Sequence, residues 1–289
     1  MSGVGDGARI TDLRYSRDDS ARGGTGASVL ALARWGAMGA LGARRGWKAK
    51  FLPIALTLFA LGPAVVLLGL RAFLPDDFDG LDLVSFSDYQ RQTGAAILLF
   101  AAVIAPELLC PDRRDGVLSL YYSTALSPRQ YLAGKTIAAV VPLLLVTLLP
   151  MLFLFLGLVL FDADPLDALA SQLDDLPRIV GAGLASALYF GLLGLAISSL
   201  TPRRAFAAGA YLAVLIASTA VAGALRASGA PELANLLALP GIPTELGARL
   251  FPDYESASSL GLGAYAIGWL VVVAISCAIL LRRYRDRDL

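Results

Sequence analysis

The sequence predicts an all-α membrane protein with six transmembrane helices and both termini in the cytoplasm. Three observations lead to this prediction: the composition, six long apolar segments, and the distribution of charge between them. Hydrophobic residues make up 57% and charged residues 16% of the 289 residues, and the mean hydropathy is +0.67. A soluble domain of average composition is about half apolar and about a quarter charged. The chain departs from this average on both counts in the direction of a membrane protein.

Six segments are long and apolar enough to cross a bilayer. A spanning helix needs about 20 apolar residues, because the hydrocarbon core is about 30 Å thick and an α-helix rises about 1.5 Å per residue. Five of the segments carry no charge, and the second holds one carboxylate, Glu107, near its end. The predicted spans, within a transmembrane domain over 51–281, are 51–70, 94–110, 136–161, 179–200, 205–225 and 260–281.

The segments outside the spans alternate in charge. Most of the 24 Lys and Arg residues lie in four segments, 1–50, 111–135, 201–204 and 282–289. Acidic residues outnumber basic ones in the three intervening segments, 71–93, 162–178 and 226–259. Cytoplasmic loops collect Lys and Arg, so we expect both termini and the basic loops in the cytoplasm of a cell (inner or plasma) membrane. An even number of spans agrees with this arrangement.

The basic segment before the first span has two parts. Residues 1–27 lack an apolar stretch and are predicted to be a disordered cytoplasmic tail rather than a signal peptide. Residues 28–50 fit a helix lying in the membrane interface, with basic residues on one arc and tryptophans on the opposite arc. A basic, Trp-bearing flank that anchors the first span is an equally good interpretation. The residues concerned are Arg34, Trp35, Arg44, Arg45, Trp47 and Lys48.

The loop between the second and third spans has the most informative pattern. Asp112 is placed to cap a helix, with Asp115 three residues later in the capping-box position. Apolar side chains at helical spacing follow it, and Ser127 with Pro128 marks the start of the next helix. We predict a short cytoplasmic helix over 112–126 whose apolar face presses into a groove on another protein; lying on the bilayer surface is the alternative. The apolar face consists of Leu118, Tyr121, Tyr122 and Ala125.

With its six spans, this loop resembles the permease subunit of type-2 ABC transporters, a mostly export-type class. The family pattern is an acid, three residues, Gly-Thr-Leu, a short helix ending in a small residue and Thr-Pro-Leu-Ser, then a basic residue and Leu-Gly-Lys. The chain has Asp where Glu is usual, Val where Thr is usual and Ala where Pro is usual. The corresponding residues are Asp112, Gly116, Val117, Leu118, Ser123, Thr124, Ala125, Leu126, Ser127, Arg129, Gly134 and Lys135.

The resemblance implies a type-2 ABC exporter permease fold. It also implies that this chain spans the membrane while separate subunits bind and hydrolyse ATP. The loop helix would be a coupling helix seated on a separate ABC ATPase subunit, 28–50 an elbow helix, and 231–250 a re-entrant segment in the last outside loop. The implied assembly has two permease copies, expected to form a homodimer, and two ATPases, in contact with membrane lipids. The aliphatic span interiors fit a hydrophobic or amphipathic substrate, and the resemblance implies that this substrate is exported. ATP and Mg²⁺ would be bound by the ATPases, and this chain would bind no cofactor. The implied coupling residues are Asp112, Arg113, Arg114, Asp115, Gly116, Leu118, Tyr121, Tyr122 and Ala125.

Several other functions find little support in the residues. The chain has no histidine and only two cysteines, Cys110 and Cys277, which leaves no His-based catalytic group and no four-thiolate metal site. The end of a phosphate-binding loop appears at Gly134-Lys135, but Arg129 stands where that loop requires glycine. A stand-alone carrier or channel is the alternative function, although a carrier usually keeps ionisable groups at membrane depth. A membrane-embedded enzyme is the third, and no nucleic-acid partner is expected.

Small residues recur in the predicted fourth span. Gly183, Ala187 and Gly191 follow one another at four-residue spacing, which lets helix backbones approach closely in lipid. The spacing fits packing within the subunit and equally a seam between two copies.

Overall fold

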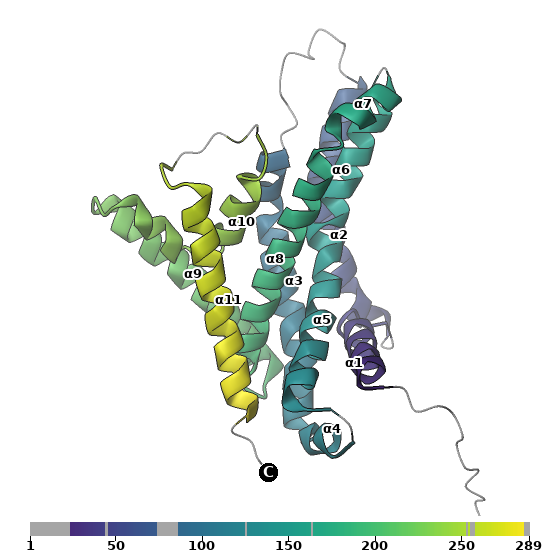
Figure 1. The fold of residues 1–289 in the computed structure, drawn as a ribbon, viewed down its shortest axis with the longest axis vertical. Helices are drawn as coiled ribbons and strands as arrows, with labels where there is room; N and C mark the ends of the chain where they lie inside the picture. Colours follow the sequence, from purple (N-terminus) through teal and green to yellow (C-terminus); the bar gives the residue numbers. More distant parts are fainter. Residues whose placement is uncertain are drawn as a thin grey trace, which may run out of the picture.

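The computed structural model describes residues 24–285 except 44–45, 74–85, 125, 163, 253 and 255–257, and it does not describe the side chains of 122–124. The described part of the chain consists of helices and connecting turns (Figure 1). Six helices within it are long and apolar enough to cross a membrane. They are α2 (Trp47–Phe73), α3 (Phe86–Arg114), the consecutive pair α5 (Pro128–Thr147) and α6 (Leu149–Leu160), α8 (Asp175–Ser198), α9 (Arg204–Ala227) and α11 (Leu262–Arg285). The shorter helices are α1 (Thr25–Ala40), α4 (Leu118–Thr124), α7 (Pro165–Gln172), the 3-10 helix η2 (Glu232–Leu237) and α10 (Gly241–Ala248).

Each predicted span corresponds to one of these helices, but several helices are longer than predicted. The α3 helix begins at Phe86 rather than at residue 94, and α8 begins at Asp175 rather than at residue 179. A hydropathy pattern places the end of a span at the first charged residues, whereas the helix itself can continue beyond the hydrocarbon core. Acidic residues in the first turn, here Asp88 and Asp175, even favour this continuation, because they face the positive end of the helix dipole.

The predicted third span is broken near its middle. The α5 helix ends at Thr147, Leu148 forms a turn, and α6 starts at Leu149. Pro150 explains the break, because proline has no backbone N–H and its ring collides with the carbonyl of the residue four positions earlier. Gly183 of α8 packs against this break, and a Cβ added there would lie 3.2 Å from Leu148 Cβ.

The predicted elbow helix over 28–50 is wrong in its second half. The α1 helix ends at Ala40, and the chain turns at Gly42, whose φ is +73°. A Cβ at Gly42 would lie 2.9 Å from the Ala49 carbonyl, so this turn requires glycine. Trp47 and Lys48 belong to the first turn of α2, whereas Arg44, Arg45 and most of the predicted tail 1–27 lie outside the described residues.

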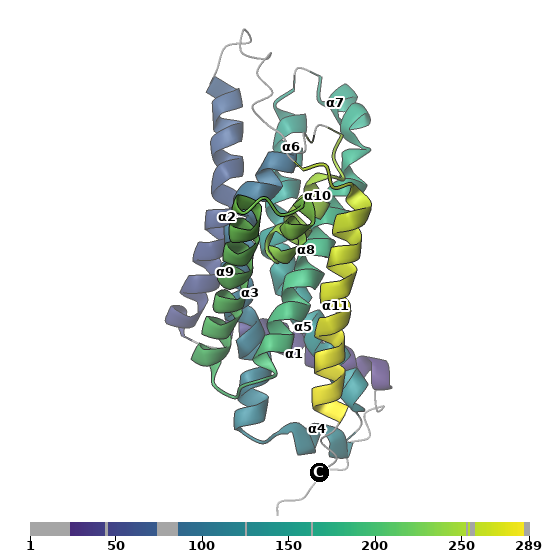
Figure 2. The same ribbon diagram turned by 90° about the vertical axis from the view of Figure 1, so that its left-hand side faces the viewer.

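The core lies where α3, α5 and α8 pack together. Most of the apolar span of α3 and of α8 is buried, whereas α2, α9 and α11 expose most of theirs. Figure 2 shows α2, α9 and α11 around the outside of the bundle. Their exposed surfaces are rich in leucine, isoleucine, valine and phenylalanine, which is the surface that lipid tails require.

The two ends of the bundle carry opposite charge. The α1 and α4 helices and the C-terminal end of α11 lie at one end, which we call the basic end, and α7 lies at the other, the acidic end (Figure 1). The described basic residues of the loops and helix ends at the basic end are Arg113, Arg114, Arg129, Lys135, Arg203, Arg204, Arg282, Arg283 and Arg285. Those at the acidic end include Asp88, Asp162, Asp164, Asp167 and Asp175.

The segment between α9 and α11 returns into the bundle. Tyr189, near the middle of α8, donates a hydrogen bond to the Leu239 carbonyl at 2.9 Å. The Leu239 N–H donates to Ser218 Oγ of α9 at 3.2 Å. The η2 and α10 helices therefore occupy the predicted segment 231–250 and bring its middle between α8 and α9.

Candidate coupling site

A buried ion pair ties the end of α3 to the start of α5. Lys135 Nζ lies 2.7 Å from Asp112 Oδ2, and the two side chains are only 6% and 14% exposed. Tyr131 donates its hydroxyl to the same oxygen at 2.8 Å, and Lys135 also donates to the Leu108 carbonyl at 2.8 Å. Each charge thus has a partner of opposite sign and a second hydrogen bond, which a buried pair needs to offset its lost hydration.

The prediction that Asp112 caps the next helix is wrong. Asp112 lies inside the last turn of α3, which continues to Arg114. The chain then turns at Gly116, whose φ is +68°, and the Val117 N–H bonds to the Asp112 carbonyl at 3.2 Å. A left-handed glycine with this hydrogen bond is the usual end of an α-helix. Gly116 therefore ends α3 and does not belong to the loop helix.

The apolar face of α4 packs against its own chain. Leu118 is only 8% exposed and belongs to the main hydrophobic core. The Tyr121 ring lies 5.5 Å from the Tyr131 ring, which lies 5.6 Å from the ring of Tyr284 on α11. Leu118 is therefore covered by its own chain and not by a partner, because helical spacing identifies an apolar face without saying what covers it. Tyr121 is partly exposed, and its contact with a partner stays a prediction. The Tyr122 side chain and Ala125 lie outside the described part.

The opposite side of this loop is exposed. The Leu120 side chain is 64% exposed, and the charged pair of Arg114 Nε and Asp115 Oδ1, 2.8 Å apart, lies nearby on the surface. We call the exposed residues Arg114, Asp115, Gly116, Ser119 and Leu120 the loop surface. Sequence analysis missed Leu120 because it does not belong to the apolar stripe.

The start of α5 follows the predicted capping pattern. Ser127 Oγ accepts the Gln130 N–H at 3.4 Å, and Gln130 Oε1 accepts the Ser127 N–H at 2.8 Å. Pro128 occupies the first turn. This reciprocal capping box confirms the predicted helix start and fixes the second end of the α4 loop.

The turn between α8 and α9 is bound to the end of α3. Glu107 Oε1 lies 2.7 Å from Arg204 Nη1, and Arg113 donates a hydrogen bond to the Ser199 carbonyl. The Cys110 thiol donates to the Thr201 carbonyl at 3.4 Å. The pairing of Glu107 with Arg204 could not be predicted from local sequence patterns, because 97 positions separate the two residues.

The other predicted site residues lie apart from this loop. Arg34 and Trp35 are exposed on α1, which packs on α5 through a face of small residues, and a Cβ added at Gly36 would lie 2.9 Å from Ala138 Cβ. Ala187 is fully buried, and a Cβ at Gly191 would lie 3.3 Å from Leu143 Cδ1. The small face of α8 thus packs against α5 within the subunit.

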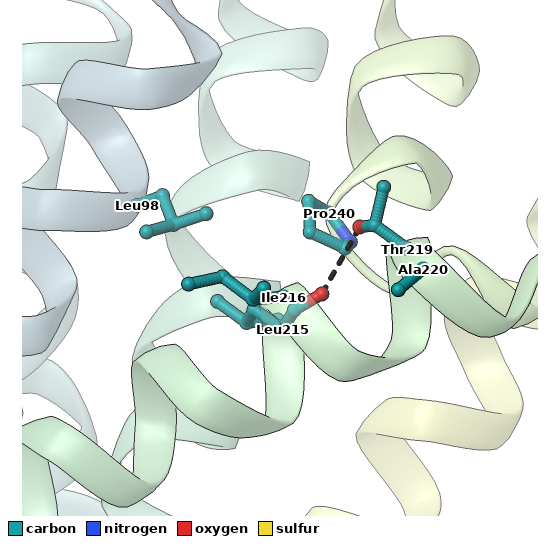
Figure 3. A pocket seen from close by; sticks show the side chains of 6 residues that line it. All are labelled: Leu98, Leu215, Ile216, Thr219, Ala220 and Pro240. Carbon is teal, nitrogen blue, oxygen red and sulfur yellow. Dashed lines mark hydrogen bonds between the residues drawn. The ribbon is translucent and has the colours of Figure 1, made fainter. Parts of the chain in front are cut away.

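An apolar cavity of about 370 Å³, wide open to the surface of the bundle, lies between α3, α9 and the segment before α10 (Figure 3). The Thr219 hydroxyl donates to the Leu215 carbonyl of its own helix at 3.0 Å, so the cavity wall is almost entirely apolar. A second cavity of about 300 Å³ shares Leu98 and Pro240 with it and extends to Arg91 and Glu245. The residues lining the first cavity are Leu98, Leu215, Ile216, Thr219, Ala220 and Pro240.

The arrangement defines the class of the protein as an all-helical, multi-pass membrane protein. No protein-family model matches the chain, and no curated protein matches it significantly. Among the described residues, no group of three or more His, Cys, Asp or Glu side chains is placed to hold a metal ion.

Proposed function

We propose that the chain is the membrane-spanning permease subunit of an ATP-driven exporter of the type-2 ABC class. It works as two copies with two separate ATPase subunits that bind ATP and Mg²⁺. The observation that carries the proposal is the α4 loop: a short helix, fixed at both ends, that projects at the basic end and exposes Leu120. The charge difference between the two ends supports a cytoplasmic location for this loop and for both termini.

The contacts of α4 support a mechanical role. Its Tyr121 ring is in contact with Tyr131 of α5, and through Tyr131 with Tyr284 of α11. The same Tyr131 binds Asp112 at the end of α3. A displacement of α4 by an ATPase would therefore reach three spanning helices through close side-chain contacts, and packed side chains transmit such shifts because they resist compression.

The apolar cavity beside α9 supports a path for an apolar cargo. Its lining comes from α3, α9 and the segment before α10, and the adjoining cavity brings Arg91 and Glu245 to its far end. An apolar wall with charged groups at one end fits a hydrophobic or amphipathic substrate. In this mechanism, movement of α3 relative to α9 opens and closes the cavity.

The proposal predicts that the loop surface, rather than the buried face of α4, controls coupling. Leu120→Asp should lower ATP-dependent transport and stimulation of the ATPase that co-purifies with the tagged chain by on the order of tenfold, because a charge there opposes an apolar contact with the partner. Leu118→Asp and Tyr121→Asp, by contrast, should disrupt this end of the fold itself. Transport and ATP hydrolysis are measured in proteoliposomes.

The matched control is Leu166→Asp, which changes an exposed leucine on the short helix α7 at the acidic end. This variant should keep transport and ATPase stimulation near the wild-type levels. Equal activities of wild type and Leu120→Asp would refute the proposed coupling surface. Sustained uphill transport by the purified chain without ATP would refute the exporter and support a stand-alone carrier.

A further inference from the structure

A third cavity, of about 330 Å³, lies at the basic end between the end of α3 and the α8–α9 turn. Its wall combines three arginines with apolar residues, and no acidic residue is among the described residues that line it. We propose that this cavity binds the phosphate headgroup of an anionic lipid from the adjacent leaflet. The proposed site does not depend on the transport function. Its lining includes Pro111, Arg114, Pro202, Arg203, Arg204 and Phe206.

The cavity has a cationic group left for a ligand. Arg204 pairs with Glu107 and Arg114 with Asp115, but in the described part of the chain no carboxylate lies within salt-bridge distance of Arg203. The Nε–H of Arg204 is also buried without a hydrogen-bond partner among the described residues. A phosphate supplies the counter-charge that Arg203 lacks, and the planar guanidinium fits phosphate well.

The first turn of α9 adds to this attraction. Arg203 is the N-cap residue of α9 and makes no side-chain capping bond, so the first N–H groups of this 24-residue helix have no side-chain acceptor from it. Residues of this turn line the cavity. The start of a long helix favours an anion, because its unpaired N–H groups and its dipole both present positive charge.

The apolar part of the cavity indicates a lipid rather than a free phosphate ion. The Phe206 side chain is 64% exposed, and its ring lies 5.6 Å from the Arg203 guanidinium carbon. The exposed Leu200 lies on the same turn. An acyl chain can cover these residues while the headgroup stays beside the arginines, which is the arrangement expected where spanning helices meet the headgroup layer.

The test uses the full-length protein purified in an uncharged detergent. Binding of dioctanoyl phosphatidylglycerol and dioctanoyl phosphatidylcholine is measured by native mass spectrometry and by the shift of the unfolding temperature. We expect the anionic lipid to bind more tightly than the zwitterionic one. Arg203→Ala should weaken the binding of phosphatidylglycerol roughly fivefold, and Arg203→Lys should weaken it less because it keeps the charge.

The matched control is Arg129→Ala, which removes an exposed arginine at the same end that does not line the cavity. This variant should bind phosphatidylglycerol as the wild type does. Equal weakening in the Arg203 and Arg129 variants would overturn the proposal and indicate general surface attraction. Equal affinity for both lipids would also overturn it. Displacement of phosphatidylglycerol by an equal concentration of inorganic phosphate would show that the site binds free phosphate instead.

Discussion

Lys135 and Asp112 form a largely buried ion pair at the two ends of the α4 loop. Replacing Lys135 by methionine leaves the Asp112 carboxylate mostly buried without its counter-charge. Breaking a buried pair in this way costs about 3 kcal/mol. We therefore expect Lys135→Met to lower the free energy of unfolding in detergent by about this amount, measured by chemical denaturation. The double variant Asp112→Asn/Lys135→Met should recover part of the loss, because it removes the unpaired charge. No difference between the single and double variants would contradict this account.

The contact of Glu232 with Ser258 and Ser259 is expected to depend on pH. Its carboxylate accepts hydrogen bonds from the Ser259 hydroxyl, the Ser258 hydroxyl and the Ser259 N–H, and these bonds hold the pKa of Glu232 below its usual range. A lowered pKa in the folded state means that the contact stabilises the fold above the pKa of the unfolded state. The contact is lost as the pH falls through the lowered value.

Acidification should therefore release residues 258–260 before the rest of the fold unfolds. Hydrogen exchange of this segment, corrected for the intrinsic effect of pH, should rise on the acidic side of an ordinary glutamate pKa. Glu232→Gln should show the faster exchange already at neutral pH and lose most of the pH dependence. A wild-type segment whose corrected exchange does not change with pH would rule this out.

At the scale of elements, Gly194 of α8 packs directly against Ala105 of α3. A Cβ added there would lie 2.7 Å from Ala105 Cβ, and the Ala105 Cβ cannot rotate away. Gly194→Ala should therefore push the two helices apart and lower the free energy of unfolding by about 1–3 kcal/mol. Gly209→Ala is the control, because no atom lies within 4 Å of its added Cβ. Equal unfolding midpoints for the two variants would contradict the close packing.

The sequence predicted where the helices lie along the chain better than it predicted which residues of different helices contact one another. The spans could be predicted because charge is almost absent from them, and the start of α5 could be predicted because Ser127 and Gln130 form a local capping box. Gly183 and Gly191 indicated the packing face of α8, but their spacing could not show that Gly194 makes the tightest contact, because this depends on Ala105 of another helix. The direction in which α4 faces was missed for the same reason.

The ion pairs of the candidate site also could not be predicted from local sequence patterns. Asp112 and Lys135 are 23 positions apart and lie on different helices, and in the sequence each fits an ordinary local role: a helix cap for Asp112 and a residue of the basic loop for Lys135. The pairing of Glu107 with Arg204 spans 97 positions. Local patterns report which residues share a face, whereas these contacts are set by how α3, α5 and α9 pack.

For the whole molecule, the segregation of charge makes a prediction about orientation. In a variant without Cys110 and Cys277, single cysteines replace Arg129 at the basic end and Asp167 at the acidic end, both exposed. A maleimide that cannot cross membranes should label the Asp167→Cys variant in intact cells, and label the Arg129→Cys variant only after the membrane is opened. The reverse pattern would place the α4 loop outside the cell and remove it from any cytoplasmic ATPase.

The two hydrogen bonds at Leu239 limit how α8 and α9 can separate. Tyr189 of α8 donates to the Leu239 carbonyl and Ser218 of α9 accepts its N–H, so the two helices cannot part at this depth without detaching that peptide group from one of them. Two net hydrogen bonds amount to about 1–3 kcal/mol. A cost of this size keeps the peptide group attached most of the time, yet a modest force on either helix is enough to release it.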